Sequence, residues 1–184
     1  TFYHNNKTAN VGVFGKPLAR LDGLQVGVLA TVNKPDSIKQ AASLKASFAA
    51  DNVDVKVVAE RLADGVDETY SAADAVNFDA ILVANGAEGL FARDSFTARP
   101  ANSTTATLYP AGRPLQILVD GFRYGKPVGA LGSGAKALDA AEISTTRAGV
   151  YVANSTTDSF INGVRDGLRT FKFLDRFAID EDAE

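Results

Sequence analysis

Apolar positions in the middle of the chain follow two patterns, short unbroken runs and longer stretches with helical spacing. Unbroken runs are typical of strands covered on both faces, and helical spacing is typical of helices with one buried side. Because the two patterns alternate, the sequence predicts an α/β fold, a doubly wound parallel sheet with helices on both faces. The expected strands are 24–31, 53–58, 80–84, 127–131 and 149–153, and the expected helices are 35–50, 115–124 and one that follows 155–158.

The last helix carries the clearest pattern, because Ser, Thr and Asp side chains at 155–158 can cap its first turn. Its predicted buried side chains are Phe160, Ile161, Val164, Leu168, Phe171 and Leu174. Its other face is predicted to carry Arg165, Arg169, Lys172 and Arg176, which suit the negative end of the helix dipole. The helix at 115–124 has a shorter apolar face made of Leu115, Leu118, Val119 and Phe122.

These patterns delimit one domain, which we place at residues 23–176. Residues 1–22 have no sustained period and are rich in Asn, Thr, Gly and Lys, so we expect a linker or arm there. The polar stretch 59–77 predicts a small excursion before the third main strand, and the Thr- and Pro-rich segment 95–110 predicts a surface loop. Residues 177–184 are predicted to form an acidic tail in solvent.

Composition narrows the classes of function. The 184 residues are 46% hydrophobic and 22% charged, which is ordinary for a globular domain. A net charge of −3 argues against a nucleic-acid partner, because phosphate-binding faces are usually basic. No apolar run reaches the ~20 residues of a membrane-spanning helix, so we expect no membrane partner. Without cysteine, and with His4 as the single histidine, the sequence predicts no disulfide and no metal site.

The stretch 126–138 reads as a short apolar strand, a tight glycine turn and the start of a helix. A turn of this kind can present one side chain at the carboxyl edge of a sheet, where hydrolases place their nucleophile. Here the turn is Gly132-Ser133-Gly134, and Gly132 has no nucleophile to present. We therefore predict no catalytic residue in the chain and a vestigial elbow at Gly132, Ser133 and Gly134.

Two other interpretations of this turn stay open. The segment 132–137 fits a relaxed dinucleotide-binding fingerprint, although no acidic residue closes a second strand about 20 residues later. Ser133 and Lys136 also fit the pattern Ser-x-x-Lys, in which a lysine deprotonates a serine. The alternative function is therefore a small-molecule or nucleotide-binding domain, or a weak hydrolase. Its candidate ligand-binding residues are Asn85, Gly86, Glu88, Ser133 and Lys136.

Three Asn-x-Ser/Thr patterns match the acceptor motif for N-linked glycans. Asn6 and Asn102 lie in segments that we expect to be exposed, so they are the candidate acceptors. Asn154 lies beside the predicted cap of the last helix, and we expect the cap to compromise Asn154 as a glycan acceptor. The chain also begins at Thr1 without an initiator methionine, which indicates a fragment or a processed product. These features hint at a secreted or cell-wall protein and leave the localisation open.

The order of the elements resembles the flavodoxin-like, class I glutamine-amidotransferase-like superfamily. There a strand that starts with Lys-Pro, here Lys126-Pro127, leads into an elbow that carries a cysteine. Gly132 stands at the position of that cysteine, and Ser133 stands where a histidine often follows. The glutamate expected after the first strand has no match at 33–36, where Asp36 fits only in a shifted register, and the oxyanion loop reads Ala84-Asn85-Gly86. The resemblance implies a flavodoxin-like fold without the chemistry of those relatives.

The chain is also similar, over essentially its whole length, to the C-terminal domain of large-subunit (clade 2) haem catalases, fungal ones in particular. The resemblance is carried by Tyr3-His4-Asn5-Asn6-Lys7-Thr8 and Phe14-Gly15-Lys16-Pro17-Leu18 in the arm, by 78–86, and by 157–160 at the start of the last helix. It implies a non-catalytic accessory domain of a hydrogen-peroxide-degrading catalase. The implied partners are the catalase core and the parent homotetramer, and the haem cofactor would belong to that core, with no cofactor in this domain.

Two activities follow from this resemblance as expectations. The domain would stabilise the parent enzyme and cover the approach to its core. It would also act as a holdase-type molecular chaperone that binds unfolded client proteins through exposed apolar side chains. The candidates for client binding are Phe2, Tyr3, Val13 and Phe14 in the arm.

Overall fold

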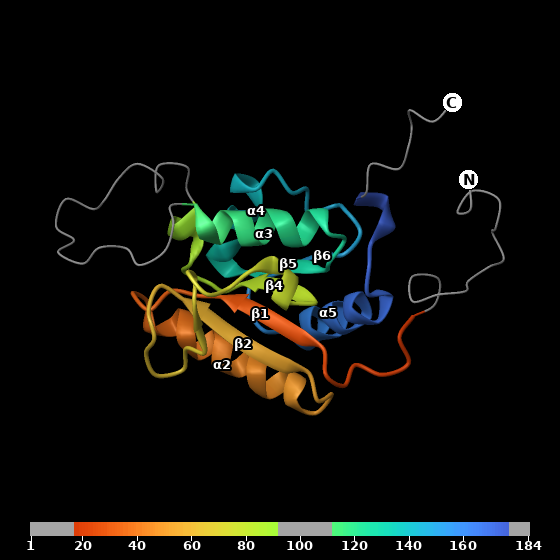
Figure 1. The fold of residues 1–184 in the computed structure, drawn as a ribbon, viewed down its shortest axis with the longest axis horizontal. Helices are drawn as coiled ribbons and strands as arrows, with labels where there is room; N and C mark the ends of the chain where they lie inside the picture. The colour runs from red at the N-terminus through yellow and green to blue at the C-terminus, as the bar shows by residue number, and fades with distance from the viewer. Residues whose placement is uncertain (1–16, 92–111, 177–184) are drawn as a thin grey trace.

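The computed structural model describes residues 17–91 and 112–176 of the chain. Within these residues the strands form one six-stranded sheet, in which every neighbouring pair is parallel. The strand order is β3-β2-β1-β4-β5-β6 (Figure 1). The strands are β1 (Gln25–Leu29), β2 (Asp54–Ala59), β3 (Glu68–Thr69), β4 (Ala80–Val83), β5 (Val128–Leu131) and β6 (Val150–Ala153). Since β3 has only two residues, the five longer strands give the flavodoxin-like order, and the predicted α/β class is confirmed.

Helices cover both faces of the sheet. Helices α2 and α5 pack against one face, and α3 and α4 pack against the other (Figure 1). The helices are α2 (Pro35–Ala49), α3 (Arg113–Arg123), α4 (Ala135–Ala140) and α5 (Asp158–Thr170). Short 3₁₀ turns join the elements at η1 (Ala75–Asn77), η2 (Glu88–Phe91), η4 (Gly132–Gly134) and η5 (Leu174–Arg176).

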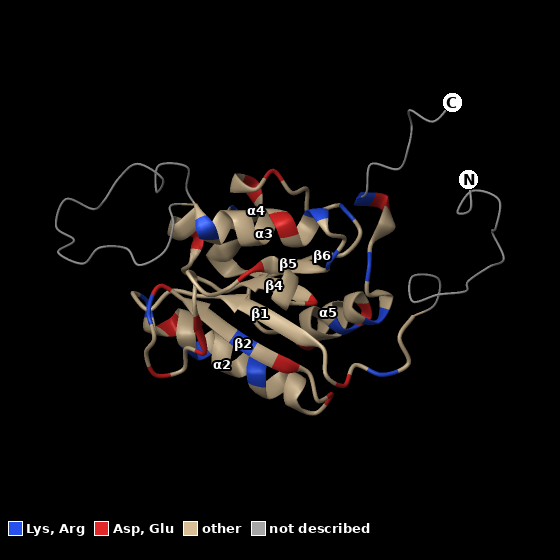
Figure 2. Cartoon of the chain, in the orientation of Figure 1, with Lys and Arg blue, Asp and Glu red and all other residues tan. Residues whose placement is uncertain are grey.

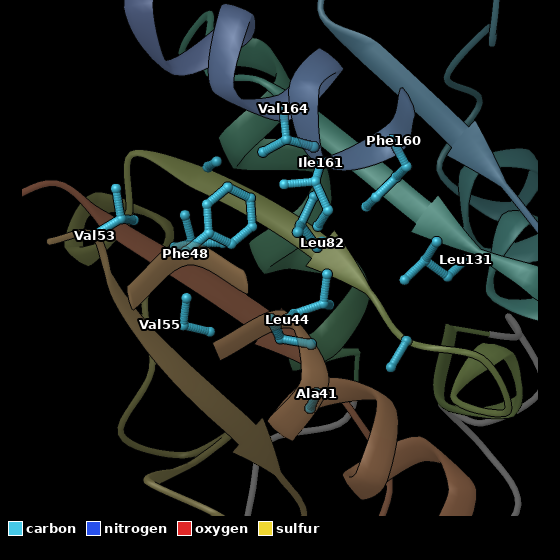
Figure 3. Close-up of a cluster of buried hydrophobic side chains, with 14 of the residues drawn as sticks. Ala41, Leu44, Phe48, Val53, Val55, Leu82, Leu131, Phe160, Ile161 and Val164 are labelled. Atoms are coloured by element: carbon cyan, nitrogen blue, oxygen red, sulfur yellow. The ribbon is translucent and has the colours of Figure 1, made fainter. Parts of the chain in front are cut away.

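The unbroken apolar runs fill two cores, because alternate side chains of a strand point to opposite faces of the sheet. In β4, Leu82 belongs to the cluster under α2 and α5, whereas Ile81 and Val83 belong to the cluster under α3 and α4. Figure 3 shows Phe48 of α2 and Ile161 of α5 close to Leu82. Each side chain of this size stabilises the fold by roughly 1.5–3 kcal/mol when fully buried, before the entropy of ordering it is subtracted.

Helix α5 begins as the sequence predicts and ends earlier. Thr157 is its N-cap, and four of the predicted apolar residues, Phe160, Ile161, Val164 and Leu168, are buried. The helix stops at Thr170, because Phe171 adopts a left-handed φ of 71° and turns the chain away. Phe171 and Leu174 are therefore only partly buried, and their prediction as helical core residues was wrong.

The basic face predicted for this helix also needs correction at its end. Arg165 and Arg169 lie on α5, but Lys172 and Arg176 follow the helix in the segment that turns away. Arg176 is half-buried, and its guanidinium group lies 4.2 Å from the centre of the Phe122 ring and 4.9 Å from that of Phe173. Arg176 is therefore part of the packed structure, whereas the helical pattern had predicted that it lies on the basic face of the helix.

The predicted apolar face of α3 does pack on the sheet, since Leu118 is buried and Leu115 and Phe122 contact the same core, but the buried face also includes residues that were not predicted. Ile117, Leu118 and Gly121 are buried, while Val119 is only partly buried. A Cβ atom at Gly121 would collide with the side chain of Ile81, so this glycine lets α3 approach β4 closely. The helical period could not show this, because a glycine carries no apolar side chain to mark the buried face.

The remaining predicted segments fall partly outside the described residues. The excursion at 59–77 is confirmed, and it contains the short strand β3 and the turn η1. Residues 17–23 lie against the domain, since Leu21 is 4% exposed and the Leu18 backbone nitrogen donates to the Arg169 carbonyl at 2.6 Å. The first sixteen residues, the predicted loop 95–110 and the acidic tail lie outside the described residues, so the domain limits stay a prediction.

Candidate functional site

The carboxyl ends of β1, β4 and β5 meet where the strand order changes direction, which is the usual ligand-binding edge of a sheet of this type. Strand β5 ends at Leu131, and the turn η4 leads directly into α4. Gly132 adopts a left-handed φ of 56°, a conformation that side chains disfavour. A Cβ atom placed on it would lie 2.5 Å from Asn85 Oδ1 and 2.9 Å from Asn85 Cγ. The turn has the shape of an elbow, and the Asn85 amide fills the space that a side chain at 132 would need.

The next glycine of the turn has a packing role. A Cβ atom on Gly134 would lie 2.7 Å from the Ala84 carbonyl oxygen and 3.0 Å from the Val83 carbonyl oxygen. These atoms belong to the backbone of β4 and the residue after it, so they cannot move aside cheaply. Gly134 therefore lets the start of α4 pack directly against the end of β4.

Ser133 is the centre of a hydrogen-bond network at this edge. Its backbone N–H donates to Asn85 Oδ1 at 2.9 Å, and the Gly86 N–H donates to Ser133 Oγ at 3.0 Å. The Ser133 hydroxyl lies 2.7 Å from Asn85 Oδ1 and 2.9 Å from Glu88 Oε2. Because a hydroxyl has one proton, it donates to one of these two oxygens at a time. The network ties the loop after β4 to the turn after β5.

Glu88 supplies the negative charge of the site. Burial raises the pKa of its carboxyl group, but hydrogen bonds from its own backbone and from Ser133 lower it, as do the charges of Lys34 and Lys136. The net effect is a pKa below the ordinary value of 4.5, so Glu88 is an ionised acceptor at neutral pH. A carboxylate with a lowered pKa is a weak base, so Glu88 is a poor activating group for the Ser133 hydroxyl.

The other side of this edge is formed by the loop after β1 and by α2. Lys34 Nζ lies 4.0 Å from Glu88 Oε1, and a Cβ atom on Gly86 would lie 2.8 Å from Lys34 Cδ. The Asn85 backbone N–H donates to Gln40 Oε1 at 2.7 Å. Polar contacts therefore cross the line between β1 and β4, where this class of fold normally holds its ligand.

Four of the five candidate ligand-binding residues come together at this edge. Asn85, Gly86, Glu88 and Ser133 share the hydrogen bonds described above. Lys136 is exposed and acts on Glu88 through its charge. Within the described residues its amine makes no hydrogen bond with Ser133, so the geometry gives no support to the Ser-x-x-Lys interpretation.

Comparison with known proteins places this arrangement in a family. Residues 22–178 match the family described as the C-terminal domain found in long catalases. The chain belongs to this family. The match confirms the resemblance to catalase C-terminal domains that the sequence indicated.

Several fungal catalases contain a segment similar to this chain. The chain is 62% identical over 181 residues to Catalase B of Aspergillus oryzae and 63% identical over 182 residues to Catalase B of Aspergillus fumigatus, covering 98% of the chain in each case. Catalase-3 of Neurospora crassa is 48% identical over 184 residues, which is 100% of the chain. The chain spans 25%, 25% and 24% of the lengths of these three relatives, about a quarter of each.

A second polar cluster of the catalase domain was missed in the sequence. Glu60 follows β2, and its carboxylate accepts from Thr31 Oγ1 at 3.0 Å, from Asn33 Nδ2 at 3.3 Å and from the Val32 N–H at 3.4 Å. Burial raises the pKa of Glu60, although the hydrogen bonds from Thr31 and Val32 oppose the shift. Asp36, which the sequence offered as the acidic residue after the first strand, is exposed in the first turn of α2. The carboxylate beside the end of β1 comes from the neighbouring strand instead, and the polar stretch that begins at 59 was its only sequence signal.

Two kinds of functional feature are absent from the described residues, a metal-binding cluster and a membrane-spanning helix. In residues 17–91 and 112–176, no group of three His, Cys, Asp or Glu side chains could hold a metal ion. No helix in these ranges is long and apolar enough to cross a bilayer.

Figure 2 shows Lys and Arg interspersed with Asp and Glu, and α2, α3 and α5 each carry both signs of charge. The glycosylation candidates Asn6 and Asn102, and His4, lie outside the described residues.

Proposed function

We propose that this chain is a non-catalytic accessory domain of a hydrogen-peroxide-degrading haem catalase, and that it stabilises the parent homotetramer. One observation carries the proposal: the elbow turn is built around Gly132, and the Asn85 amide occupies the space beside it. A nucleophile at this turn would meet Asn85, and Glu88, the base that contacts the neighbouring Ser133 hydroxyl within the described residues, is a weak one. The family match and the fungal catalases that contain a similar segment support the context.

The haem of such a parent would be bound outside this domain. Haem iron takes its protein ligand from His, Cys, Met or Tyr. The chain contains neither Cys nor Met, and its one histidine, His4, lies outside the described residues. Three tyrosines lie in the described residues. Tyr70 is buried, and its hydroxyl donates to the Ala30 carbonyl at 2.7 Å. The Tyr151 ring packs against Gly163 and Gly167 of α5, and Tyr124 lies on the surface with 42% of it exposed, so none of the three faces an enclosed haem site. The described residues do not fit a haem site.

Comparing the parent catalase with and without this domain tests the proposal. We expect peroxide decomposition per haem to be unchanged at low temperature after the domain is deleted. We also expect activity to be lost at a lower temperature, and the tetramer to dissociate at a lower urea concentration. Equal resistance of the two forms, or peroxide decomposition by the isolated chain, would contradict the proposal.

A holdase activity is a second candidate, favoured by exposed apolar side chains in the described residues. Leu62 and Val76 are both 66% exposed. The arm residues proposed for client binding, Phe2, Tyr3, Val13 and Phe14, lie outside the described residues. We expect the chain to reduce light scattering by a heat-stressed client protein, and the double variant Leu62→Ser and Val76→Ser to reduce it less. No suppression at equimolar ratio removes this candidate.

Ligand binding at the β1–β4 edge is the competing hypothesis. The candidate residues Asn85, Glu88 and Ser133 already satisfy one another, so we expect nucleotides, flavin and dicarbonyl compounds to leave the melting temperature unchanged. A ligand at 100 times its Kd would add about 2.7 kcal/mol of stability, which a thermal shift detects easily. A shift that disappears in Ser133→Ala would favour the ligand-binding domain over the accessory domain.

A further inference from the structure

The loop between β6 and α5 carries a glycosylation motif, and all three residues of the motif lie in the described part of the chain. Asn154-Ser155-Thr156 satisfies the acceptor pattern, with a middle residue other than proline. Asn154 is exposed, and it is the first residue after β6. Within the described residues its side-chain amide makes no hydrogen bond, so nothing has to break when that nitrogen is modified.

The helix cap does not involve the hydroxyl that the motif requires. The N-cap of α5 is Thr157, whose Oγ1 accepts from the Phe160 N–H at 3.2 Å. The motif uses Thr156, one residue earlier. The one backbone bond inside the loop joins the Thr157 N–H to the Ser155 carbonyl at 2.8 Å. The cap and the acceptor motif therefore use different threonines, so the structure gives no reason for the cap to compromise Asn154.

The loop lies at the outer margin of the sheet. Strand β6 is the last strand of the sheet, and Ala153 pairs with Leu131 of β5, so Asn154 leaves the sheet at its carboxyl edge. Neighbouring Val152 is 44% exposed, and Ser155 is exposed as well. A bulky group attached to the amide can therefore extend into solvent without displacing a buried side chain.

We propose that Asn154 is an N-glycan acceptor when this chain passes through a secretory pathway. In the transfer, the amide nitrogen Nδ2 forms a bond to the anomeric carbon of a lipid-diphosphate-linked oligosaccharide. The bond from that carbon to the phosphate oxygen breaks, the lipid diphosphate leaves with the electron pair, and the amide loses one proton to a base of the transferase. The folded domain accommodates the product because the modified atom stands outside the core.

The test uses the full chain, produced in yeast behind a cleavable secretion signal. Asn6→Gln and Asn102→Gln are introduced so that Asn154 is the one acceptor motif left. The secreted protein is treated with N-glycosidase in heavy-oxygen water, digested, and mapped by mass spectrometry. We expect an oxygen-labelled aspartate at 154 in most of the protein.

Three variants separate the acceptor motif from the helix cap. Thr156→Ala removes the motif and should abolish the label at 154, whereas Thr156→Ser keeps the motif and should retain it. Thr157→Ala removes the cap and should retain the label. Recovery of unmodified Asn154 from folded, secreted protein overturns the proposal, as does a label that survives Thr156→Ala.

If a variant is not secreted, a second measurement still tests whether it is glycosylated. Translation of the same chains in the presence of microsomal membranes reports attachment as a loss of gel mobility that glycosidase reverses. We expect this change for the chain with Asn154 as its sole motif and for Thr156→Ser, but not for Thr156→Ala. Equal mobility of all three chains with and without membranes contradicts the assignment.

Discussion

At Gly132, conformation and space act together to exclude a side chain. The left-handed φ of 56° alone would cost any other residue about 1–2 kcal/mol. The contact of 2.5 Å between a Cβ atom and Asn85 Oδ1 adds a steric term. Asn85 cannot move freely, because its Oδ1 accepts from the Ser133 N–H and its own N–H donates to Gln40.

Gly132→Ala should therefore lower the free energy of unfolding by roughly 2–4 kcal/mol, measured by urea denaturation. Gly89→Ala is the matched control, since a Cβ atom there meets nothing within 4 Å. It should change stability by less than about 0.5 kcal/mol. In the double variant Gly132→Ala and Asn85→Ala, the added methyl group no longer meets the Asn85 amide. Its loss of stability should therefore be smaller than the sum of the losses in the two single variants. Strict additivity would contradict the proposed contact.

Two carboxylates near the carboxyl edge have pKa values shifted in opposite directions. The pKa of Glu88 is lowered, so its contribution to stability is complete above the ordinary value of 4.5 and is lost as the pH falls through the lower folded value. Burial raises the pKa of Glu60, so the folded state holds its proton more tightly and stability decreases as the pH rises from 4.5 through the higher folded value.

The pH dependence of unfolding should distinguish these two residues. In Glu88→Gln we expect a smaller loss of stability than in the unmodified chain as the pH falls below 4.5. In Glu60→Gln we expect the decrease between pH 4.5 and neutrality to become smaller. The measurement is urea unfolding at a series of pH values, and it compares slopes, because each substitution also alters hydrogen bonds. Identical slopes in all three proteins would exclude both assignments.

Secondary-structure elements were predictable where one periodic pattern determined them. The strand around Leu82 and the start of α5 follow from an unbroken apolar run and from a capping threonine. The end of α5 was not predictable, because Leu174 continues the apolar period while Phe171 leaves the helix. Beyond the turn at Phe171, a distant contact holds the chain in its new direction, in which the Phe173 N–H donates to the Gly125 carbonyl at 2.6 Å.

The cap of α5 gives a test with two internal controls. Thr157→Ala, in protein made without glycosylation, should lower the free energy of unfolding by about 1 kcal/mol, because the Phe160 N–H loses its acceptor. Ser155→Ala and Thr156→Ala remove hydroxyls from the same loop without touching the cap, and they should have little effect. Equal losses from all three changes in chemical denaturation would show that the cap is assigned to the wrong residue.

In the candidate site too, some contacts could be predicted from the sequence, and others depend on how distant segments of the chain pack. Asn85, Glu88 and Ser133 could be placed together from sequence, because they follow strands that end at the same sheet edge. Glu60 also follows a strand that ends at this edge, but no motif marked it, and its contact with Thr31 depends on the register in which Val58 pairs with Leu29. The filling of the space beside Gly132 by the Asn85 amide is likewise set by packing between β4 and β5, which no motif encodes.

For the molecule as a whole, the segment after α5 ties the amino ends of the last strands together. Arg176 donates to the carbonyls of Phe122 and Lys126 and, at 2.8 Å, to that of Ala148. Its guanidinium group also stacks on the rings of Phe122 and Phe173. Burial lowers its pKa to about 10, so it remains charged at neutral pH. One side chain thus joins the end of α3 to the segments that lead into β5 and β6.

Arg176→Ala should therefore lower the free energy of unfolding by roughly 2–4 kcal/mol, because several charged hydrogen bonds and a stacking contact are lost together. Arg176→Lys should recover little, since an ammonium group cannot reproduce the planar fork of donors. Arg169→Ala is the control, because its ion pair with Asp166 at 3.0 Å is exposed and should contribute less than about 1 kcal/mol. Thermal and urea unfolding of the three variants measure the difference, and similar losses at 169 and 176 would refute it.

The pairing of Gly132 with Asn85 limits how this domain can change over generations. A cysteine that arose first at 132 would meet the Asn85 amide and weaken the fold. Loss of Asn85 first would leave the Ser133 N–H without its acceptor and would still provide no thiol. Either order passes through a less stable protein. Single-step mutation is therefore opposed at both starting points, and the glycine at 132 together with the Asn85 side chain hinders the acquisition of covalent chemistry.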